Sequence, residues 1–416
     1  MKVYFFLLLG LFTTSLIAQL DTTYTLHIEG YDWGAGANQV VLPISATYEA
    51  APADQYTVAV ARTASCTELP PEQAQRTARV MRTHRSDALG MPAPEGDYLT
   101  LTLFVAPFEQ ATAPMQYFFN GKCRGNEWLD YHLRITDERT GRRWTREAKR
   151  RYLPAEPFEL DGKYRHADGT ALTYAHYEPE EATDKRPLLI WLHGGGEGGT
   201  DPSVALLANR AANYAAPEMQ AHFGGAYVLV PQTPTFWMDR GDGEYTRGEV
   251  DDRYYQALLG LIDDYLLQYP NVDRDRIYVG GCSNGGYMTM KLLLTRPDFF
   301  AAAYPSALAM YAEHVTDAQL KSIKHVPIWF LHSRDDTTTP PEKTVVPMVQ
   351  RLRELGAQNV HFSYYDHVID LTGLFGGATF HYPGHFSWVY SHTDHARTEV
   401  DGKSVSLLEW LAGQGR

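Results

Sequence analysis

Positive charge is in short supply in this chain. It has 416 residues, with 37 Lys and Arg against 50 Asp and Glu, so its formal net charge is −13. This balance argues against a nucleic-acid backbone or an anionic membrane as the partner. The sequence also lacks internal repeats and low-complexity tracts. Its hydrophobic fraction of 44% and charged fraction of 21% are ordinary for a globular protein, and its length is sufficient for two domains.

Long hydrophobic runs are equally scarce, with one short exception at the N-terminus. Lys2 precedes an apolar stretch from Val3 to Leu11, and small residues follow as far as Ala18. A charged start, a short apolar core and small residues are typical of an export signal, cleaved here just before Gln19. The run is too short for a membrane anchor. We therefore expect residues 1–18 to be a signal peptide and the mature protein to be secreted or periplasmic.

Cysteine is the third scarce feature, with only three in the chain. Cys66 and Cys123 could pair in an exported protein, although two cysteines alone are weak evidence for a disulfide. Cys282 stands in a glycine-rich turn. We expect it to be a small buried residue behind that turn rather than a catalytic thiol.

Residues 20–155 have the pattern of one all-β domain. Alternating or apolar strand candidates are separated by turn-rich spacers, one of which is expected over residues 34–38. Several strands without strong helices predict an antiparallel, sandwich-like domain. The domain contains no evident catalytic constellation and could be a binding module, a spacer or a cap over the site. The candidate strands are Tyr24–Glu29, Gln55–Ala61, Tyr98–Val105 and Trp128–Ile135.

From residue 158 to residue 416 strand and helix signals alternate. This pattern predicts a mostly parallel sheet with crossover helices on both faces, the arrangement of an α/β fold. A hairpin over residues 165–177 is expected to precede it. The candidate strands are Pro187–Leu192, Ala226–Val230, Ile277–Val279, Phe300–Tyr304, Val326–Leu331 and Val360–Tyr365, and the candidate helices are Asp251–Gln268, Tyr287–Thr295, Pro341–Leu355 and Val405–Leu411.

A G-x-S-x-G sequence with Ser283 at its centre lies between the strand ending at Val279 and the helix beginning at Tyr287. Strand, tight turn and helix are the context in which this pattern forms a nucleophile elbow. The flanking Gly281 and Gly285 allow the strand and helix to approach closely around the strained apex residue. The sequence therefore predicts Ser283 as a catalytic nucleophile.

A serine nucleophile needs a base, and the base needs an acid that orients it. The segment H-S-R-D-D-T-T-T-P, which begins at His332, follows a core strand at the edge of the sheet where sites form. Asp336 stands four residues after the histidine and four before the proline. It is the preferred acid because it matches the acid position of H-G-x-x-D-x-x-x-P, the usual motif in folds of this kind. Asp335 remains the alternative.

Among the late histidines, His385 is the preferred base. It lies in P-G-H-F-S-W, where a Pro-Gly turn and aromatic neighbours would fix a loop beside a pocket. The segment His392-Thr393-Asp394-His395 could suggest a metal site, but we expect it to be a solvated polar loop. The sequence thus indicates no metal and no cofactor. Residues 369–382, rich in glycine and aromatic residues, are a candidate lid.

The tetrahedral intermediate needs N–H donors for its oxyanion. One expected donor is the backbone amide of Asn284, directly after the nucleophile. The other is that of Gly195, in the H-G-G-G segment that follows the strand Pro187–Leu192. Candidate substrate-binding residues are Gln232, Trp237 and Trp388, although each could equally be a packing residue.

The region from about 160 to 400 resembles secreted esterases of the α/β-hydrolase fold. It is similar to the carbohydrate esterase family 1, feruloyl esterase and polyhydroxybutyrate depolymerase-like group, and to bacterial prolyl-oligopeptidase-family serine hydrolases. This resemblance implies Ser283, Asp336 and His385 as the triad, although Ser333 stands where glycine is usual. The carrying motifs are L-H-G-G-G-E-G-G from Leu192, V-P-Q-T-P from Val230, G-G-C-S-N-G-G-Y-M-T from Gly280 and G-H-F-S-W from Gly384; G-Y-D-W-G-A-G from Gly30 resembles the N-terminal sandwich domain of such hydrolases.

Three functions compete on this evidence. The first is a hydrolase of carboxylic esters, such as polysaccharide-linked acyl or feruloyl esters or a polyester. The second is a peptidase or amidase using the same triad. The third is a non-catalytic binding protein on a hydrolase scaffold, which a missing triad member would indicate. Fold and triad do not fix the substrate.

Overall fold

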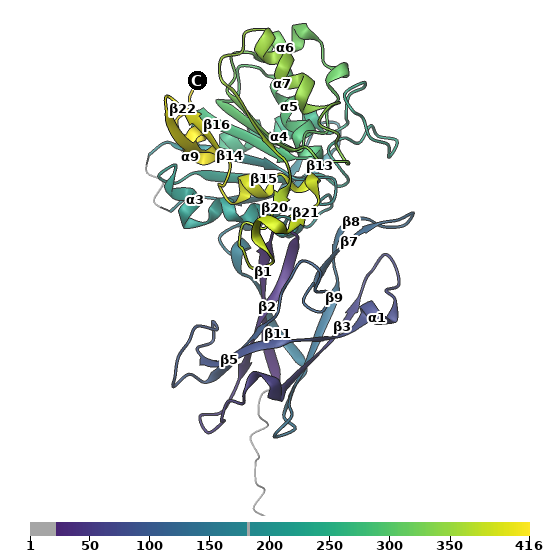
Figure 1. The fold of residues 1–416 in the computed structure, drawn as a ribbon, viewed down its shortest axis with the longest axis vertical. Helices are drawn as coiled ribbons and strands as arrows, with labels where there is room; N and C mark the ends of the chain where they lie inside the picture. Colours follow the sequence, from purple (N-terminus) through teal and green to yellow (C-terminus); the bar gives the residue numbers. More distant parts are fainter. Residues whose placement is uncertain (1–21, 181–183) are drawn as a thin grey trace, which may run out of the picture.

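The computed structural model describes residues 22–180 and 184–416. The chain forms an N-terminal β domain and a larger C-terminal α/β domain, which meet at a narrow waist (Figure 1). The predicted signal peptide lies outside the described residues. Among the residues that are described, no helix has the length and apolar character needed to cross a membrane.

The N-terminal domain consists of two packed sheets. One has the strand order β11-β1-β2-β6-β5 and the other β10-β9-β3-β4, while β7 and β8 form a separate hairpin. Neighbouring strands are antiparallel except for β1 and β11, which are parallel. The bounds are β1 Thr23–Tyr31, β2 Gly34–Pro43, β3 Tyr56–Thr63, β4 Gln75–Ala78, β5 Val80–Ser86, β6 Tyr98–Leu103, β7 Met115–Phe119, β8 Arg124–Trp128, β9 Asp130–Asp137, β10 Arg143–Trp144 and β11 Arg146–Tyr152, with one short helix, α1 Pro71–Ala74.

The expected spacer over residues 34–38 is instead the beginning of strand β2. Its small residues pair with β1, and its later residues pair with β6. A side chain at Gly36 would come within 2.7 Å of the Tyr31 ring. Glycine is therefore required here by close packing inside a sheet and not by a turn.

The C-terminal domain is built on one sheet of eight strands, in the order β12-β13-β15-β14-β16-β17-β18-β19. The first two strands form the predicted hairpin and pair antiparallel, and the strands from β15 onward are parallel. The bounds are β12 Glu159–Arg165, β13 Ala171–Tyr177, β14 Arg186–Leu192, β15 Tyr227–Gln232, β16 Val272–Cys282, β17 Ala302–Ser306, β18 Ile328–Ser333 and β19 Val360–Tyr365.

Helices cover both faces of this sheet, which explains the continuous apolar runs in its strands. In β14, Leu188, Ile190 and Leu192 pack towards the helices α4, α5 and α7. Leu189 and Trp191 face the opposite side, where α2 lies. The helices are α2 Pro202–Leu207, α3 Pro217–Ala221, α4 Tyr255–Gln268, α5 Asn284–Thr295, α6 Asp317–Ile323, α7 Val345–Glu354, α8 Val389–His392 and α9 Leu407–Ala412.

The two domains share one continuous apolar core on the α2 side of the sheet. Polar contacts also cross the boundary: the Trp128 indole N–H donates to the Ser203 hydroxyl over 2.9 Å, and Arg210 pairs with the buried Asp32 at 3.0 Å. The N-terminal domain is thus packed against the α/β domain rather than linked to it by a loose tether.

The candidate lid lies at the waist. Two short strands lie at its ends and pair with each other: β20 Val368–Ile369, which begins one residue before it, and β21 His381–Tyr382. The ring of Trp33, in the turn after β1, contacts Phe375 and Tyr382 of this segment. Figure 1 shows β20 and β21 directly above β1.

Candidate active site

Ser283 occupies a strained turn at the end of the central strand β16. Its backbone has φ 54° and ψ −110°, a conformation that residues other than glycine rarely adopt, and α5 begins at the next residue. A side chain at Gly285 would lie 1.8 Å from the Leu192 carbonyl oxygen, and one at Gly281 would lie 2.5 Å from the Gly285 carbonyl oxygen. Only glycine fits at these two positions, so the turn holds Ser283 at the carboxyl edge of the sheet.

Asp336 and His385 form a direct pair. Nδ1 of His385 lies 2.8 Å from Oδ2 of Asp336, whose side chain is fully buried. Asp336 also accepts hydrogen bonds from the amides of Thr338 and Thr339. Burial opposes the charge of Asp336, but hydrogen bonds from His332 and His385 outweigh it and hold its pKa well below the ordinary value. The carboxylate therefore remains charged and orients the imidazole.

Asp335, the alternative acid, points elsewhere. Its Oδ2 lies 2.8 Å from Nδ1 of His367, and its Oδ1 accepts a hydrogen bond from the Ser333 hydroxyl. Ser333, which stands where glycine is usual, thus has Asp335 as its hydrogen-bond partner, and Asp335 pairs with His367 rather than with His385. Sequence reasoning missed the second histidine beside the acid: Nε2 of the buried His332 lies 3.2 Å from Asp336 Oδ2.

The H-G-G-G segment follows β14 and reaches the same site. Gly194, Gly195 and Gly196 line one cavity together with Ser283 and Asn284. A side chain at Gly195 would come within 2.8 Å of the Asn284 side-chain nitrogen, so the two predicted oxyanion donors lie on segments in close contact.

His193, at the start of this loop, holds it in place. Burial lowers the pKa of His193 to about 4, so the ring is neutral. Its Nε2 accepts a hydrogen bond from the Thr233 amide over 3.2 Å, which leaves Nδ1 as the donor to the Gly194 carbonyl at 2.6 Å.

The N-terminal domain holds the loop from the other side. The backbone amide of Asn126 donates to the Gly196 carbonyl over 2.6 Å, and the side-chain amide nitrogen of Asn126 donates to the same oxygen over 3.1 Å. That nitrogen also donates to Oε1 of Glu197 over 3.2 Å. Burial raises the pKa of Glu197 to about 7. Nothing in the sequence indicates this role of Asn126, because its contact with the loop joins residues of two domains.

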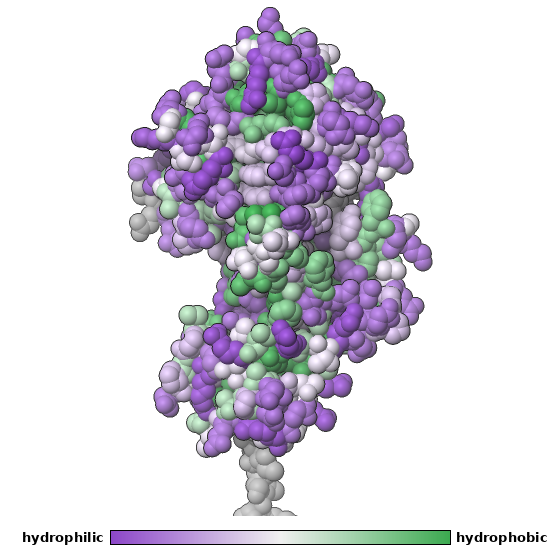
Figure 2. All heavy atoms as spheres, viewed as in Figure 1, coloured by the Kyte–Doolittle hydropathy of each residue, from purple (hydrophilic) through white to green (hydrophobic). Residues whose placement is uncertain are grey.

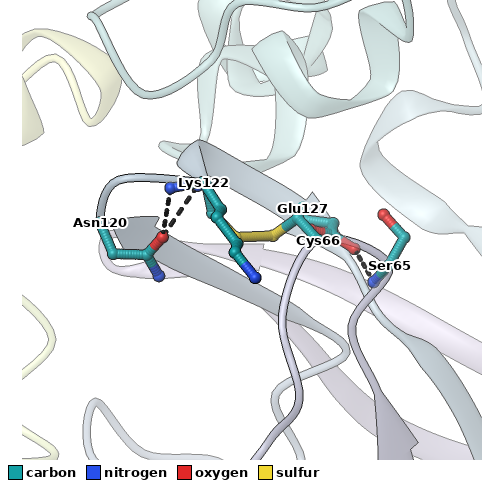
Figure 3. The surroundings of a disulfide bond; sticks show 6 residues. Ser65, Cys66, Asn120, Lys122 and Glu127 are labelled. Atoms are coloured by element: carbon teal, nitrogen blue, oxygen red, sulfur yellow. Dashed lines mark hydrogen bonds between the residues drawn. A yellow bond between two sulfur atoms is a disulfide. The ribbon is translucent and has the colours of Figure 1, made fainter.

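Asn126 lies on the β7–β8 hairpin, which a disulfide anchors to the rest of the N-terminal domain. Cys66 and Cys123 are bonded, and their Cα atoms are 5.7 Å apart. Figure 3 shows the bond beside two further contacts, from Asn120 to the following turn and from Glu127 to Ser65. The pairing that the sequence left open is therefore present, and it secures the hairpin that contacts the predicted oxyanion loop, His193–Gly196.

The cavity around Ser283 and His385 has a volume of about 590 Å³. Its wall belongs to both domains: Trp33, Tyr117, Phe119 and Asn126 come from the N-terminal side. Phe119 is 69% exposed and stands at the rim. The N-terminal domain, whose sequence shows no catalytic constellation, thus packs against the α/β domain and also forms part of the cavity wall.

The three candidate substrate-binding residues separate in the structure. Trp388 lines the cavity, and its ring lies 5.3 Å from that of His385. Gln232 is instead fully buried, and its amide donates to the Glu197 and Asp201 carbonyls. Trp237 is also fully buried and packs against the His193 ring. Gln232 and Trp237 therefore support the oxyanion loop from behind and do not face a substrate.

The segment around His392 also differs from expectation. His392 is not solvated but fully buried between the rings of Trp191 and Tyr214. Burial lowers its pKa to about 3. Within residues 22–180 and 184–416, no three His, Cys, Asp or Glu side chains gather in a way that could hold a metal ion. Cys282 is buried, as expected, and forms no disulfide.

Comparisons with known proteins agree with this architecture. Residues 23–145 match the model of an esterase Ig-like N-terminal domain, and residues 235–314 match that of the prolyl oligopeptidase family. A curated relative, feruloyl esterase B of Neurospora crassa, is 30% identical over 129 residues, which are 30% of this chain and 40% of that protein. The alignment therefore spans less than half of the feruloyl esterase.

Among solved structures, a thermostable esterase has a TM-score of 0.74 at 22% identity, covering 95% of this chain and 100% of that one. An acylaminoacyl peptidase from Pyrococcus horikoshii has a TM-score of 0.40 at 19% identity, covering 61% and 43%. The match to the thermostable esterase confirms the expected fold, and the matches to the Ig-like domain model and to the feruloyl esterase confirm the resemblance to esterases. The chain therefore has an α/β-hydrolase fold, and its N-terminal domain matches the immunoglobulin-like domain of esterases.

Proposed function

We propose that the protein hydrolyses carboxylic esters, with Ser283 as nucleophile, His385 as base and Asp336 as orienting acid. One observation carries the proposal: a serine on a strained elbow, a histidine bonded to a buried carboxylate, and a glycine-rich loop all border one cavity. These are the parts that an acyl-transfer reaction needs.

In this mechanism His385 takes the proton of Ser283 as its oxygen attacks the ester carbonyl. The amides of Gly195 and Asn284 stabilise the oxyanion. His385 then protonates the departing alcohol, and the acyl group remains on Ser283. A water molecule, deprotonated by His385, attacks the acyl-enzyme and releases the acid. Asp336 stays ionised throughout, because its hydrogen bonds favour the charged form.

For the substrate we propose a polysaccharide-linked acyl or feruloyl ester, with a polyester as the other option. The similarity to a feruloyl esterase and the aromatic wall of the cavity, with Trp33, Tyr117 and Trp388, support a ring-containing ester. We also propose that the protein is secreted or periplasmic. The disulfide supports an oxidising location, where such bonds persist.

A second candidate is a peptidase or amidase, which the match of residues 235–314 to the prolyl oligopeptidase family favours. Such an enzyme must release an amine, a poorer leaving group than an alcohol. The N-terminal domain has two small sheets and a hairpin. It is not the propeller of at least four four-stranded blades that we would expect of a prolyl peptidase.

The test compares the mature protein with Ser283→Ala on p-nitrophenyl acetate, p-nitrophenyl butyrate, a feruloyl ester and proline p-nitroanilide. We expect ester turnover that the substitution abolishes, and no anilide turnover. Activity on the anilide alone would establish the peptidase. Absence of Ser283-dependent turnover of every substrate would favour a binding protein on a hydrolase scaffold.

A further inference from the structure

A second cavity, of about 280 Å³, lies beside the catalytic cavity on the N-terminal domain. The loop between β6 and β7 forms most of its wall. Trp33 borders both cavities, so the two are neighbours across a single side chain. The lining residues are Trp33, Ala35, Val105, Ala106, Pro107, Phe108, Glu109, Gln110, Thr112 and Ala113.

Aromatic side chains connect this cavity to the catalytic one. Phe108 is 81% exposed, and its ring lies 6.0 Å from that of Phe380 in the candidate lid. Phe380 contacts Tyr382 at 5.2 Å, and Tyr382 contacts Phe386, which lines the catalytic cavity, at 6.4 Å. Figure 2 shows hydrophobic residues gathering at the waist where these segments meet. Exposed apolar surface of this kind often marks a ligand groove.

The same wall carries polar groups. Glu109 lies in it next to Phe108 and is half-buried, and one of its carboxylate oxygens accepts the Ala111 amide over 2.9 Å. A carboxylate has further acceptor capacity for hydroxyl donors. A sugar ring offers both an apolar C–H face and a rim of hydroxyl groups, so it suits a wall of aromatic rings and a carboxylate. A polyester has no such hydroxyls along its chain, and a negatively charged sugar would be repelled by Glu109.

We propose that this cavity is a saccharide subsite, which holds a neutral sugar unit of an ester substrate whose acyl group is at Ser283. The proposal rests on the proposed esterase function and adds a location for the carbohydrate part of the substrate. The immunoglobulin-like domain then contributes to the choice of substrate through Trp33, Phe108 and Glu109.

The test measures kcat/KM of the full-length protein for an acetylated xylo-oligosaccharide and for p-nitrophenyl acetate. Phe108→Ala removes an exposed ring, and Leu267→Ala, 75% exposed on α4, is the matched control. We expect Phe108→Ala to lower the ratio of the two kcat/KM values about tenfold, mainly through KM for the oligosaccharide. Glu109→Gln should lower the ratio in the same direction, and Leu267→Ala should leave both values unchanged.

Equal losses on both substrates would overturn the subsite, as would an unchanged ratio. Light scattering provides another outcome: if Phe108→Ala converts an oligomer into monomers, the patch is an interface between copies and the proposal is wrong. If neither ester is turned over, the esterase function fails separately. Calorimetry with an unesterified xylo-oligosaccharide then tests the subsite alone, and binding that does not depend on Phe108 overturns it.

Discussion

The contact between the N-terminal domain and the oxyanion loop leads to a quantitative prediction for Asn126→Ala. The substitution removes two side-chain hydrogen bonds, at 3.1 Å to the Gly196 carbonyl and at 3.2 Å to Glu197 Oε1, and leaves the backbone hydrogen bond to Gly196 in place. Each such bond contributes about 1 kcal/mol. If both bonds position the loop for the transition state, their loss raises the activation free energy by about 2 kcal/mol, which corresponds to roughly a thirtyfold lower rate.

The loss should fall on kcat rather than on KM. The oxyanion exists in the transition state and not in the bound ester, so a displaced loop weakens only transition-state binding. The assay is steady-state hydrolysis of p-nitrophenyl acetate by the purified variant. Glu127→Ala is the matched control, because Glu127 is the next residue of β8 and its carboxylate instead accepts the Ser65 amide.

Circular dichroism and the melting temperature establish that both variants are folded. If folded Asn126→Ala retains kcat within twofold of the parent, the hairpin does not position the loop and the reasoning is refuted. An equal loss in Glu127→Ala would also contradict it, because the effect would then come from the hairpin as a whole and not from Asn126.

Three further predictions concern the triad acid, the buried carboxyl and the disulfide. Asp336→Asn should lower kcat about 10⁴-fold, whereas Asp335→Asn, which loses only its pairing with His367 and Ser333, should change it less than tenfold; the two rates on one ester decide this. Burial raises the pKa of Glu197 from 4.5 to about 7, so the folded state binds the carboxyl proton more tightly than the unfolded state does. The stability that this proton contributes is fully present below pH 4.5 and is lost as the pH rises through about 7. The melting temperatures at pH 5 and pH 8 should therefore differ less in Glu197→Gln than in the parent, because the variant lacks a pH-dependent contribution on the order of 3 kcal/mol to the free energy of unfolding. An unchanged difference between the two pH values would contradict the raised pKa of Glu197. Replacing Cys66 and Cys123 by serine opens a loop of sequence separation 57 and should lower the free energy of unfolding of the N-terminal domain by about 4 kcal/mol in urea titrations, and an unchanged midpoint would be the contrary result.

The parts of the site that sequence predicts are those that local sequence determines. The elbow around Ser283 needs glycine at fixed offsets, and the alternation of strand and helix around it predicts the sheet edge on which it lies. The spacing from His332 to Asp336 likewise favours the residue that the structure brings to His385.

The contribution of Asn126 could not be predicted, because it depends on how two domains pack. Asn126 and Gly196 are 70 residues apart, and nothing near either residue indicates the other. The directions of side chains could not be predicted either. Gln232 ends strand β15 and Trp237 follows it, yet both side chains are buried behind the loop. Residues 34–38 appeared to be a spacer because small residues favour turns, but their pairing with β1 holds them in a sheet.

The most direct measurement is covalent labelling of the nucleophile. The protein is incubated with a p-nitrophenyl alkylphosphonate, and the intact protein and its peptides are analysed by mass spectrometry. The proposed mechanism predicts one phosphonyl group per chain, located on Ser283, and almost no labelling in His385→Ala because the base is missing. Labelling of another residue, or no labelling of a folded protein, would contradict the assignment of Ser283 as the nucleophile.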